Sequence, residues 1–228
     1  MINHANHLYT SISAFHYFSV SVIPTLIRFF YIKNVKGAMS IFKLEQSRRA
    51  ITFDFLFYGF SVLVLVILLA LNCPSSKWWL AITLSFAGFA ISSLVEYFSH
   101  RFILHGVKPF SNWHQRHHDQ PKAGIGTPTI VSASLIVLLI FIPVGLSLNL
   151  FYALAVTLGV VAGYGTYSVT HHATHHWHGH SRWLTRRKYW HGLHHCVRPD
   201  RCFGVTSSCW DQLFGTSQEK YVSRPKYE

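Results

Sequence analysis

The sequence predicts an all-α integral membrane protein, a bundle of four membrane-spanning helices. Half of its 228 residues are hydrophobic and only 12% are charged, whereas soluble domains typically carry about 25% charged residues. The apolar residues also form long runs without a charged side chain, and the basic residues gather outside those runs. A water-soluble globule would lack polar surface, and a disordered chain would contain fewer apolar residues.

The charge balance is strongly basic. Twenty Lys and Arg residues stand against 8 Asp and Glu, which gives a formal net charge of +12. A basic and apolar chain fits a membrane protein with one face on anionic lipid, whereas nucleic-acid binding requires a soluble basic domain. We therefore expect no nucleic-acid partner. The 4 cysteines show no CxxC spacing, so neither a disulfide framework nor a zinc ribbon is expected.

The N-terminal part of the chain is predicted to lie in the membrane interface. Apolar residues recur at helical spacing over residues 8–32, with polar residues between them, as in an amphipathic interfacial helix. A fifth membrane span is the alternative for this stretch. We divide the chain into an N-terminal interfacial segment (1–52), a membrane domain (53–217) and a C-terminal tail (218–228).

The first two spans follow directly. The run Phe55–Ser76 has no charged residue, and Trp78–Val95 is a second apolar run that opens with two tryptophans, as is common at a membrane interface. The stretch 123–170 then contains no charged residue and no histidine, and it is long enough for two spans. With Asn149 as the turn, it predicts helices at Thr129–Leu148 and Leu150–Val169.

The loops predict the orientation. The short loops near Asn149 and between the first two spans share one side, and Lys77 is the only basic residue in them. The other basic residues lie in the N-terminal part, in 100–122 and in the C-terminal part. By the positive-inside rule these three regions are cytoplasmic. The host membrane is either a bacterial inner membrane or the endoplasmic reticulum.

Histidine is the unusual residue of this chain, with 17 copies. Ten of them form four groups that follow membrane spans or lie in the polar segments after them. These groups are His100 and His105, then His114, His117 and His118, then His171 and His175, and finally His191, His194 and His195.

The spacing within these groups favours a shared metal region. In HxxHH read as a helix, positions i, i+3 and i+4 fall on one face, and His171 and His175 have the same i, i+4 relation. His100 and His105 are separated by five positions, which diverge on a regular helix. Either the helix ends near His105, or the two side chains approach the site from different sides.

Neutral imidazole is a good ligand for iron, zinc or copper. Ten histidines exceed what one ion can use, so we expect two metal ions with four or five ligands each. His172 and His176 are expected beside the site rather than on the metals. The other histidines are interpreted as surface or core residues: His4, His7, His16, His178 and His180.

Carboxylates are scarce near these groups. The candidates are Glu96, Asp119 and Asp211, so the sequence lacks the Glu-rich pattern of soluble carboxylate-bridged di-iron bundles. Glu96 either orients a ligand histidine or helps to balance the metal charge. The alternative is an interfacial residue paired with Arg101.

Several segments resemble the fatty acid hydroxylase superfamily. EYFSHRFILH at 96–105 is similar to its first histidine motif, HQRHH at 114–118 to its second, YSVTHHATHH at 167–176 to its third and HGLHH at 191–195 to its last. The C-terminal FGVTSSCWDQLFGT at 203–216 is similar to that of fatty acid 2-hydroxylases. Ser168 stands where the relatives commonly have Asp, and Ala173 and Thr174 replace a bulkier apolar pair.

The resemblance implies a four-helix membrane bundle with a cytosolic helical cap that holds a dinuclear, all-histidine metal site. It implies two iron ions, which zinc can replace, with O₂ as co-substrate and a lipid as substrate. The product would be a hydroxylated acyl chain, and the role would be in lipid biosynthesis. The ligands carried over by position are the ten histidines His100, His105, His114, His117, His118, His171, His175, His191, His194 and His195.

Partners and alternatives follow from this reading. No segment resembles a cytochrome b5 domain, so we expect a separate electron donor of the cytochrome b5, ferredoxin or reductase type. A desaturase on the same centre is the first alternative, and a zinc-dependent membrane hydrolase or metal transporter is the second. Candidate channel or lid residues, otherwise interfacial anchors, are Trp113, Tyr164, Tyr167 and Trp210. Several basic residues are expected to bind an anionic head group of the substrate, an electron-donor protein or anionic phospholipid. They are Arg101, Arg116, Lys122, Arg186, Arg187 and Lys188.

Overall fold

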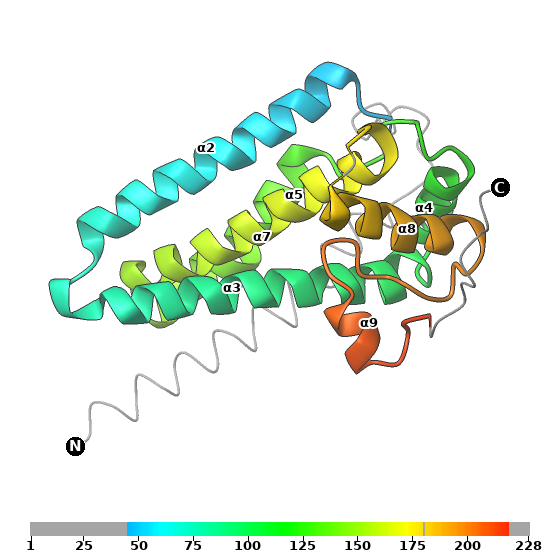
Figure 1. Cartoon of the computed structure of the whole chain (residues 1–228). Coiled ribbons are helices and arrows are strands. Elements are labelled where there is room, and N and C mark those ends of the chain that lie inside the picture. The colour runs from blue at the N-terminus through cyan, green and yellow to red at the C-terminus, as the bar shows by residue number, and fades with distance from the viewer. Residues whose placement is uncertain (1–44, 180, 219–228) are drawn as a thin grey trace.

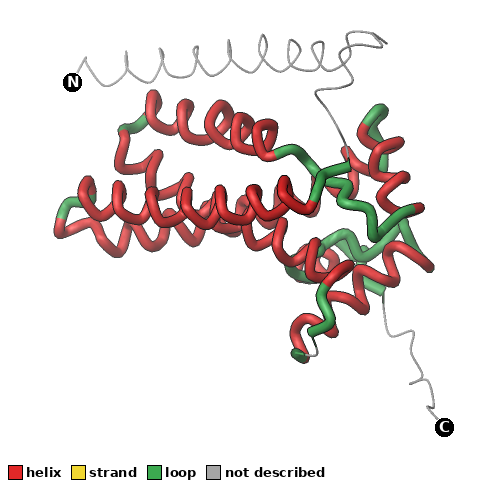
Figure 2. The backbone as a smooth tube through the Cα atoms, turned by 90° about the horizontal axis from the view of Figure 1, so that it is seen from above, coloured by secondary structure: helices red, strands yellow, loops and turns green. Residues whose placement is uncertain are grey.

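The computed structural model describes residues 45–179 and 181–218, which are nearly all helical (Figures 1 and 2). Within these ranges there is no β-strand, and the one extended pairing is an isolated bridge between Glu45 and Ile125. The predicted all-α class is confirmed. The helices in chain order are α2 (Arg48–Asn72), η2 (Ser75–Lys77), α3 (Trp78–Phe98), η3 (Ser99–Leu104), α4 (Phe110–Asp119), α5 (Thr129–Ile136), η4 (Val137–Phe141), α6 (Ile142–Ser147), α7 (Leu150–His176), α8 (Arg182–Cys196) and α9 (Cys209–Leu213).

Four continuous helical segments among the described residues are long and apolar enough to cross a membrane. They are Arg48–Asn72, Ser75–Leu104, Thr129–Ser147 and Leu150–His176. The four predicted spans are therefore confirmed. The second and fourth continue well past their predicted ends, because their histidine-bearing turns remain helical after the apolar run stops. The predicted interfacial helix at 8–32 lies outside the described residues.

Helix α7 forms the centre of the bundle. It has more buried residues than any other described helix, and it packs along α3 and α2. Small residues allow this close approach, since a Cβ at Gly159 would overlap the backbone carbonyl of Ser85 on α3. The Ser85 hydroxyl also donates to the Ala155 carbonyl at 3.0 Å. The axes of α3 and α7 are thereby held close together over their length.

The outer faces of the long helices are apolar and exposed. Leu56 and Phe60 on α2 are 67% and 65% exposed, and Trp79 and Phe86 on α3 are 82% and 72% exposed. Large exposed apolar surfaces are unusual in soluble monomers and are expected where a helix faces lipid. These faces fit the four helices into a bilayer.

The short helices form a cap at one end of the bundle. In Figure 1, α4, α8 and α9 lie around the His-bearing ends of α3 and α7, and the turns that join α2 to α3 and α6 to α7 lie at the opposite end. The turn predicted at Asn149 is confirmed, because its side chain accepts a hydrogen bond from the backbone N–H of Tyr152 and caps α7. The Ser181 hydroxyl caps α8 in the same way.

Candidate metal centre

The cap and the ends of α3 and α7 bring all ten predicted histidines together. They form two groups of five, and in each group one ligand atom per residue lies within 4.8 Å of the others. The first group is His100, His105, His114, His118 and His194, and the second is His117, His171, His175, His191 and His195. The two groups are adjacent, since the rings of His118 and His195 stack with centroids 4.2 Å apart.

The two HxxHH motifs interleave the groups. On α4 the i, i+4 pair His114 and His118 faces the first group, while His117 faces the second. On α8 the pair His191 and His195 faces the second group, while His194 faces the first. The three histidines of one motif therefore do not all serve the same group. Each motif contributes to both groups and links them.

The spacing of His100 and His105 has a local explanation. Residues Ser99–Leu104 form a π-helix, whose hydrogen bonds join residues five apart, and His105 follows it directly. The wider turn places residues i and i+5 on similar faces, so the two rings lie with centroids 5.2 Å apart. The helix does end near His105, but both side chains approach the first group from the same element. Short π-helical segments are frequent at functional sites.

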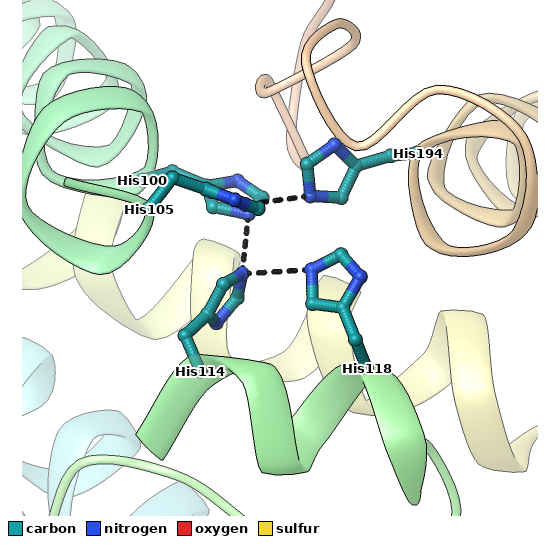
Figure 3. Close-up of side chains that lie close together, drawn as sticks. All are labelled: His100, His105, His114, His118 and His194. Carbon is teal, nitrogen blue, oxygen red and sulfur yellow. Dashed lines mark hydrogen bonds between the residues drawn. The ribbon is translucent and has the colours of Figure 1, made fainter. Parts of the chain in front are cut away.

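Backbone carbonyls fix the ring orientation of two histidines in the first group. The His100 Nδ1 lies 2.6 Å from the Phe203 carbonyl, and the His194 Nδ1 lies 2.7 Å from the Arg201 carbonyl. Because a carbonyl only accepts, each Nδ1 carries the proton and each Nε2 presents a lone pair. Figure 3 shows these Nε2 atoms facing the other histidines of the group. Ligand histidines in metalloproteins are commonly oriented in this manner.

Close contacts between ring nitrogens recur in both groups. His100 Nε2 lies 2.9 Å from His114 Nε2, and His191 Nε2 lies 2.8 Å from His175 Nε2. Both ring nitrogens of His195 are buried without a hydrogen-bond partner. Five nitrogens that face one another cannot all be satisfied by hydrogen bonds, because each neutral ring has one donor at most. A cation at the centre of each group would satisfy the lone pairs.

Burial keeps the cap histidines of the two groups neutral by lowering their pKa values. Burial, reinforced by neighbouring histidines, lowers the pKa of His117 to about 3 and that of His195 to about 2. Burial likewise lowers the pKa of His105 to about 4 and that of His194 to about 3. The pKa of His114 is shifted in the same direction by the same causes. Neutral imidazole is the ligand form, so the donor set fits a transition-metal ion such as iron, zinc or copper.

Two carboxylates hold the loop that orients His100. Glu96 Oε1 accepts hydrogen bonds from the backbone N–H groups of Val205 and Thr206, and its Oε2 accepts from the Thr206 hydroxyl. Asp211 accepts from the backbone N–H groups of Phe203 and Gly204 at 2.9 and 2.8 Å. These bonds support the predicted role of Glu96 in orienting a ligand histidine, which it would exert on His100 through this loop rather than by touching the ring. The alternative pairing with Arg101 is not found among the described residues, where the Arg101 guanidinium donates to the Tyr97 hydroxyl.

The third carboxylate and several predicted lining residues are placed elsewhere. Asp119 is exposed, accepts a hydrogen bond from Gln115 and belongs to neither histidine group. Trp210 donates to Ser93 and anchors α9 on α3, and it does not line the cavity. Arg187 is 6% exposed and donates to Ser208. It therefore lies inside the cap rather than on a surface that contacts lipid head groups.

A cavity of about 570 Å³ reaches the histidines from within the bundle. It lies between α2, α4, α5 and α7, and its walls are mostly apolar. His114 of the first group lines it, together with His117, His171 and His175 of the second. The predicted channel residues Trp113, Tyr164 and Tyr167 also line it, as do the bystander histidines His172 and His176, whose rings stack 4.4 Å apart.

One buried residue of this cavity was missed by sequence reasoning. Asp54 is 5% exposed and lines the cavity, although the predicted first span began just after it. The signal was present, because Asp54 is the only acidic residue between Glu45 and Glu96. An isolated acid at the end of an apolar span is expected to face the protein interior.

Comparison with known proteins agrees with this geometry. The family model described as fatty acid hydroxylase matches residues 85–216. A dihydroceramide fatty acyl 2-hydroxylase of Arabidopsis thaliana is 32% identical over 136 residues, which cover 54% of this chain and 56% of the relative. The fatty acid 2-hydroxylase of Rattus norvegicus is 32% identical over 143 residues, which cover 57% of this chain and 38% of that protein.

The fold is also that of a solved structure. The hydroxylase domain visible in full-length scs7p aligns with a TM-score of 0.66 at 24% identity, and the alignment covers 77% of this chain and 68% of that chain. The chain spans about half the length of the curated relatives it matches first. The family model covers more than half of the chain and includes all ten histidines, so this protein is a member of the fatty acid hydroxylase family.

Proposed function

We propose that the protein is a membrane-bound oxygenase that hydroxylates a lipid acyl chain, with O₂ as co-substrate and electrons from a separate protein. The observation that carries the proposal is the position of the two histidine groups at the wall of one apolar cavity inside the membrane bundle. A long acyl chain could enter this cavity without leaving apolar surroundings. The curated relatives named as fatty acid or dihydroceramide hydroxylases support the same class of substrate.

The ten histidines would hold two metal ions, for which we propose iron, one in each group. Paired iron ions supply the two electrons that O₂ activation and C–H hydroxylation require. The protein orients the ligands and positions the substrate. The carbonyls of Phe203 and Arg201 hold two ligand rings in one tautomer. The apolar walls place the acyl chain against His114 and His171 and exclude water from the reacting carbon.

The distribution of charge supports a cytoplasmic metal site. The described residues at the end of the bundle opposite the cap include only Lys77 as a basic residue, whereas α4 and α8 carry several. By the positive-inside rule, we propose that the cap lies in the cytoplasm. A soluble or membrane-bound donor of the cytochrome b5, ferredoxin or reductase type would reach the centre from that side, where Arg186 and Lys188 lie on the cap.

The arrangement of carboxylates argues against the hydrolase alternative. A zinc hydrolase needs a general base near an open metal position. Glu96 is occupied by the 203–206 loop, Asp119 is exposed, and neither carboxylate lines the cavity that reaches the histidines. A transporter would need ionisable ligands near the middle of the bilayer, whereas the histidine groups lie at the end of the bundle that carries the cap.

Mass spectrometry of host lipids tests the proposal. Cells that express the wild type are compared with cells that express His194→Ala together with His195→Ala, with iron and a reductase system supplied. A lipid that gains one oxygen only with the wild type is the expected result. A lipid that loses two hydrogens instead would assign a desaturase. No difference between the two in the presence of donor and iron would contradict an oxygenase.

A further inference from the structure

Asp54 lies where a carboxylate is costly. It belongs to α2, which carries no other charged residue after Arg49, and it is 5% exposed. No ion pair involves Asp54 anywhere in residues 45–179 and 181–218. Ionisable residues inside membrane spans usually face a cavity and mark a substrate path. Asp54 has this position, because its side chain lines the same cavity as the histidines.

Two hydroxyl groups orient this carboxylate. The Thr129 hydroxyl donates to Asp54 Oδ1 at 2.7 Å, and the Ser168 hydroxyl donates to Asp54 Oδ2 at 2.8 Å. These donors come from α5 and α7, so the carboxylate is held from two helices. Each carboxylate oxygen can accept two hydrogen bonds, which leaves one acceptor position on each oxygen. A donor inside the cavity could use these positions.

Ser168, which holds the carboxylate, is close to the metal centre along the chain. Ser168 precedes His171 by three residues on α7, which is about 4.5 Å along the helix axis, on neighbouring positions of one face. The ring of Tyr167 stacks on that of His171 with centroids 5.7 Å apart and lines the same wall. A polar group held by Asp54 would therefore lie near the carbon that meets the metal centre.

We propose, on the basis of the proposed function, that Asp54 is a lipid-recognition residue that accepts a hydrogen bond from an amide N–H or a hydroxyl of the substrate. A lipid whose acyl chain is joined through an ester offers no such donor at that point. The two remaining acceptor positions of the carboxylate would then be desolvated without a donor, and sites built to pair with a donor reject analogues that lack it. Asp54 thus selects donor-bearing lipids and fixes the depth of the acyl chain.

Ser168 gives this proposal an internal check. It occupies the motif position where the resemblance described above places Asp, and its hydroxyl touches Asp54 Oδ2. The carboxylate of this chain reaches that point from α2 rather than from α7. Exchanging the two residues, Asp54→Ser with Ser168→Asp, would return a carboxylate to the same part of the cavity.

Lipid binding without turnover tests the proposal on the purified, metal-loaded full chain in detergent. The probes are N-hexadecyl palmitamide and hexadecyl palmitate, which differ only in the N–H, and monopalmitoylglycerol, which offers hydroxyl donors without an amide. We expect the wild type to prefer the amide or the hydroxyl probe over the ester about tenfold, the scale of a hydrogen bond to a charged group. Which of the two is preferred identifies the source of the donor.

Two variants separate recognition from structure. Asp54→Asn is expected to lose the preference, and the exchanged pair is expected to regain it. Equal binding of all probes by the wild type would overturn the proposal. So would an equal loss of affinity for every probe in Asp54→Asn with a fall in Tm, because that result assigns Asp54 a helix-fastening role only. The binding assay does not depend on whether host lipids gain oxygen. A failure of the proposed recognition by Asp54 can therefore be distinguished from a failure of the proposed oxygenase function.

Discussion

At the scale of single residues, the histidines depend on groups that never touch a metal. His100 is oriented by the Phe203 carbonyl, and the Asp211 carboxylate holds that loop through the backbone N–H groups of Phe203 and Gly204. Outer hydrogen bonds of this kind commonly contribute 10–100-fold to metal affinity. The orientation of His100 in the first group therefore depends on the 203–206 loop.

Replacing Asp211 by Asn is expected to weaken metal binding without removing a ligand. The Asn amide would direct a donor toward a backbone N–H, and the loop would lose its hold on His100. We expect about 10–100-fold lower metal affinity in a chelator competition assay. Asp200→Asn is the matched control, because Asp200 is exposed and its ion pair within the described part of the chain is with Arg198. Unchanged affinity in Asp211→Asn would contradict this role of the loop.

The lowered pKa values predict acid sensitivity. The pKa of His117 is about 3 and that of His105 about 4 in the folded state, against 6.5 for the unperturbed group. Below pH 6.5 the unfolded chain binds more protons than the folded chain, so stability falls as the pH is lowered toward 4 and is constant above 6.5 with respect to these groups. Thermal unfolding of chelator-treated protein at several pH values measures this. A Tm that rises on acidification through this window would refute it.

At the scale of elements, the site depends on how α3 and α7 approach each other. His100 follows α3 and His171 lies near the end of α7, so the distance between the two helices sets where their histidines lie. Sequence spacing alone could not show this. Regular α-helix geometry predicted that His100 and His105 diverge. They do not, because Ser99–Leu104 is π-helical, and a π-helical turn could not be predicted from the residue pattern.

Gly159→Ala is expected to destabilise the helix pair. The added Cβ would meet the Ser85 backbone carbonyl, which cannot move aside as a side chain could. Overpacking of this type costs about 1–3 kcal/mol, and it would also displace the ends of α3 and α7. A lowered Tm together with reduced metal content is the expected result. Gly59→Ala on α2 is the control, because nothing lies within 4 Å of its added Cβ, and equal effects of both substitutions would argue against the packing account.

At the scale of the whole molecule, the membrane spans and the set of histidines that gather could be predicted from the sequence. Charge-free apolar runs predicted the four spans, and the histidine spacing predicted which ten residues gather. The division of HxxHH between two groups was not predictable, because it depends on how α4 and α8 face each other across the cap. Asp54 was missed for a similar reason, since its partners Thr129 and Ser168 are distant in the sequence.

The orientation of the whole molecule can be measured with its own cysteines. Cys196 is exposed on the cap, and Cys73 lies at the opposite end of the bundle. In single-cysteine variants expressed in a bacterial inner membrane, a maleimide that cannot cross this membrane is expected to label Cys73 in intact cells and to label Cys196 only after permeabilisation. This follows from the positive-inside rule. Labelling of Cys196 in intact cells would place the cap outside the cytoplasm.

The metal content of the purified chain tests the central claim most directly. The two groups of five histidines predict about two iron ions per chain in iron-replete expression, because each group fits one ion. His114→Ala removes a ligand of the first group and His191→Ala one of the second, and each is expected to lower the content toward one. His172→Ala, outside both groups, should leave it at two. A single ion in the wild type, or an equal loss in His172→Ala, would contradict a two-metal histidine centre.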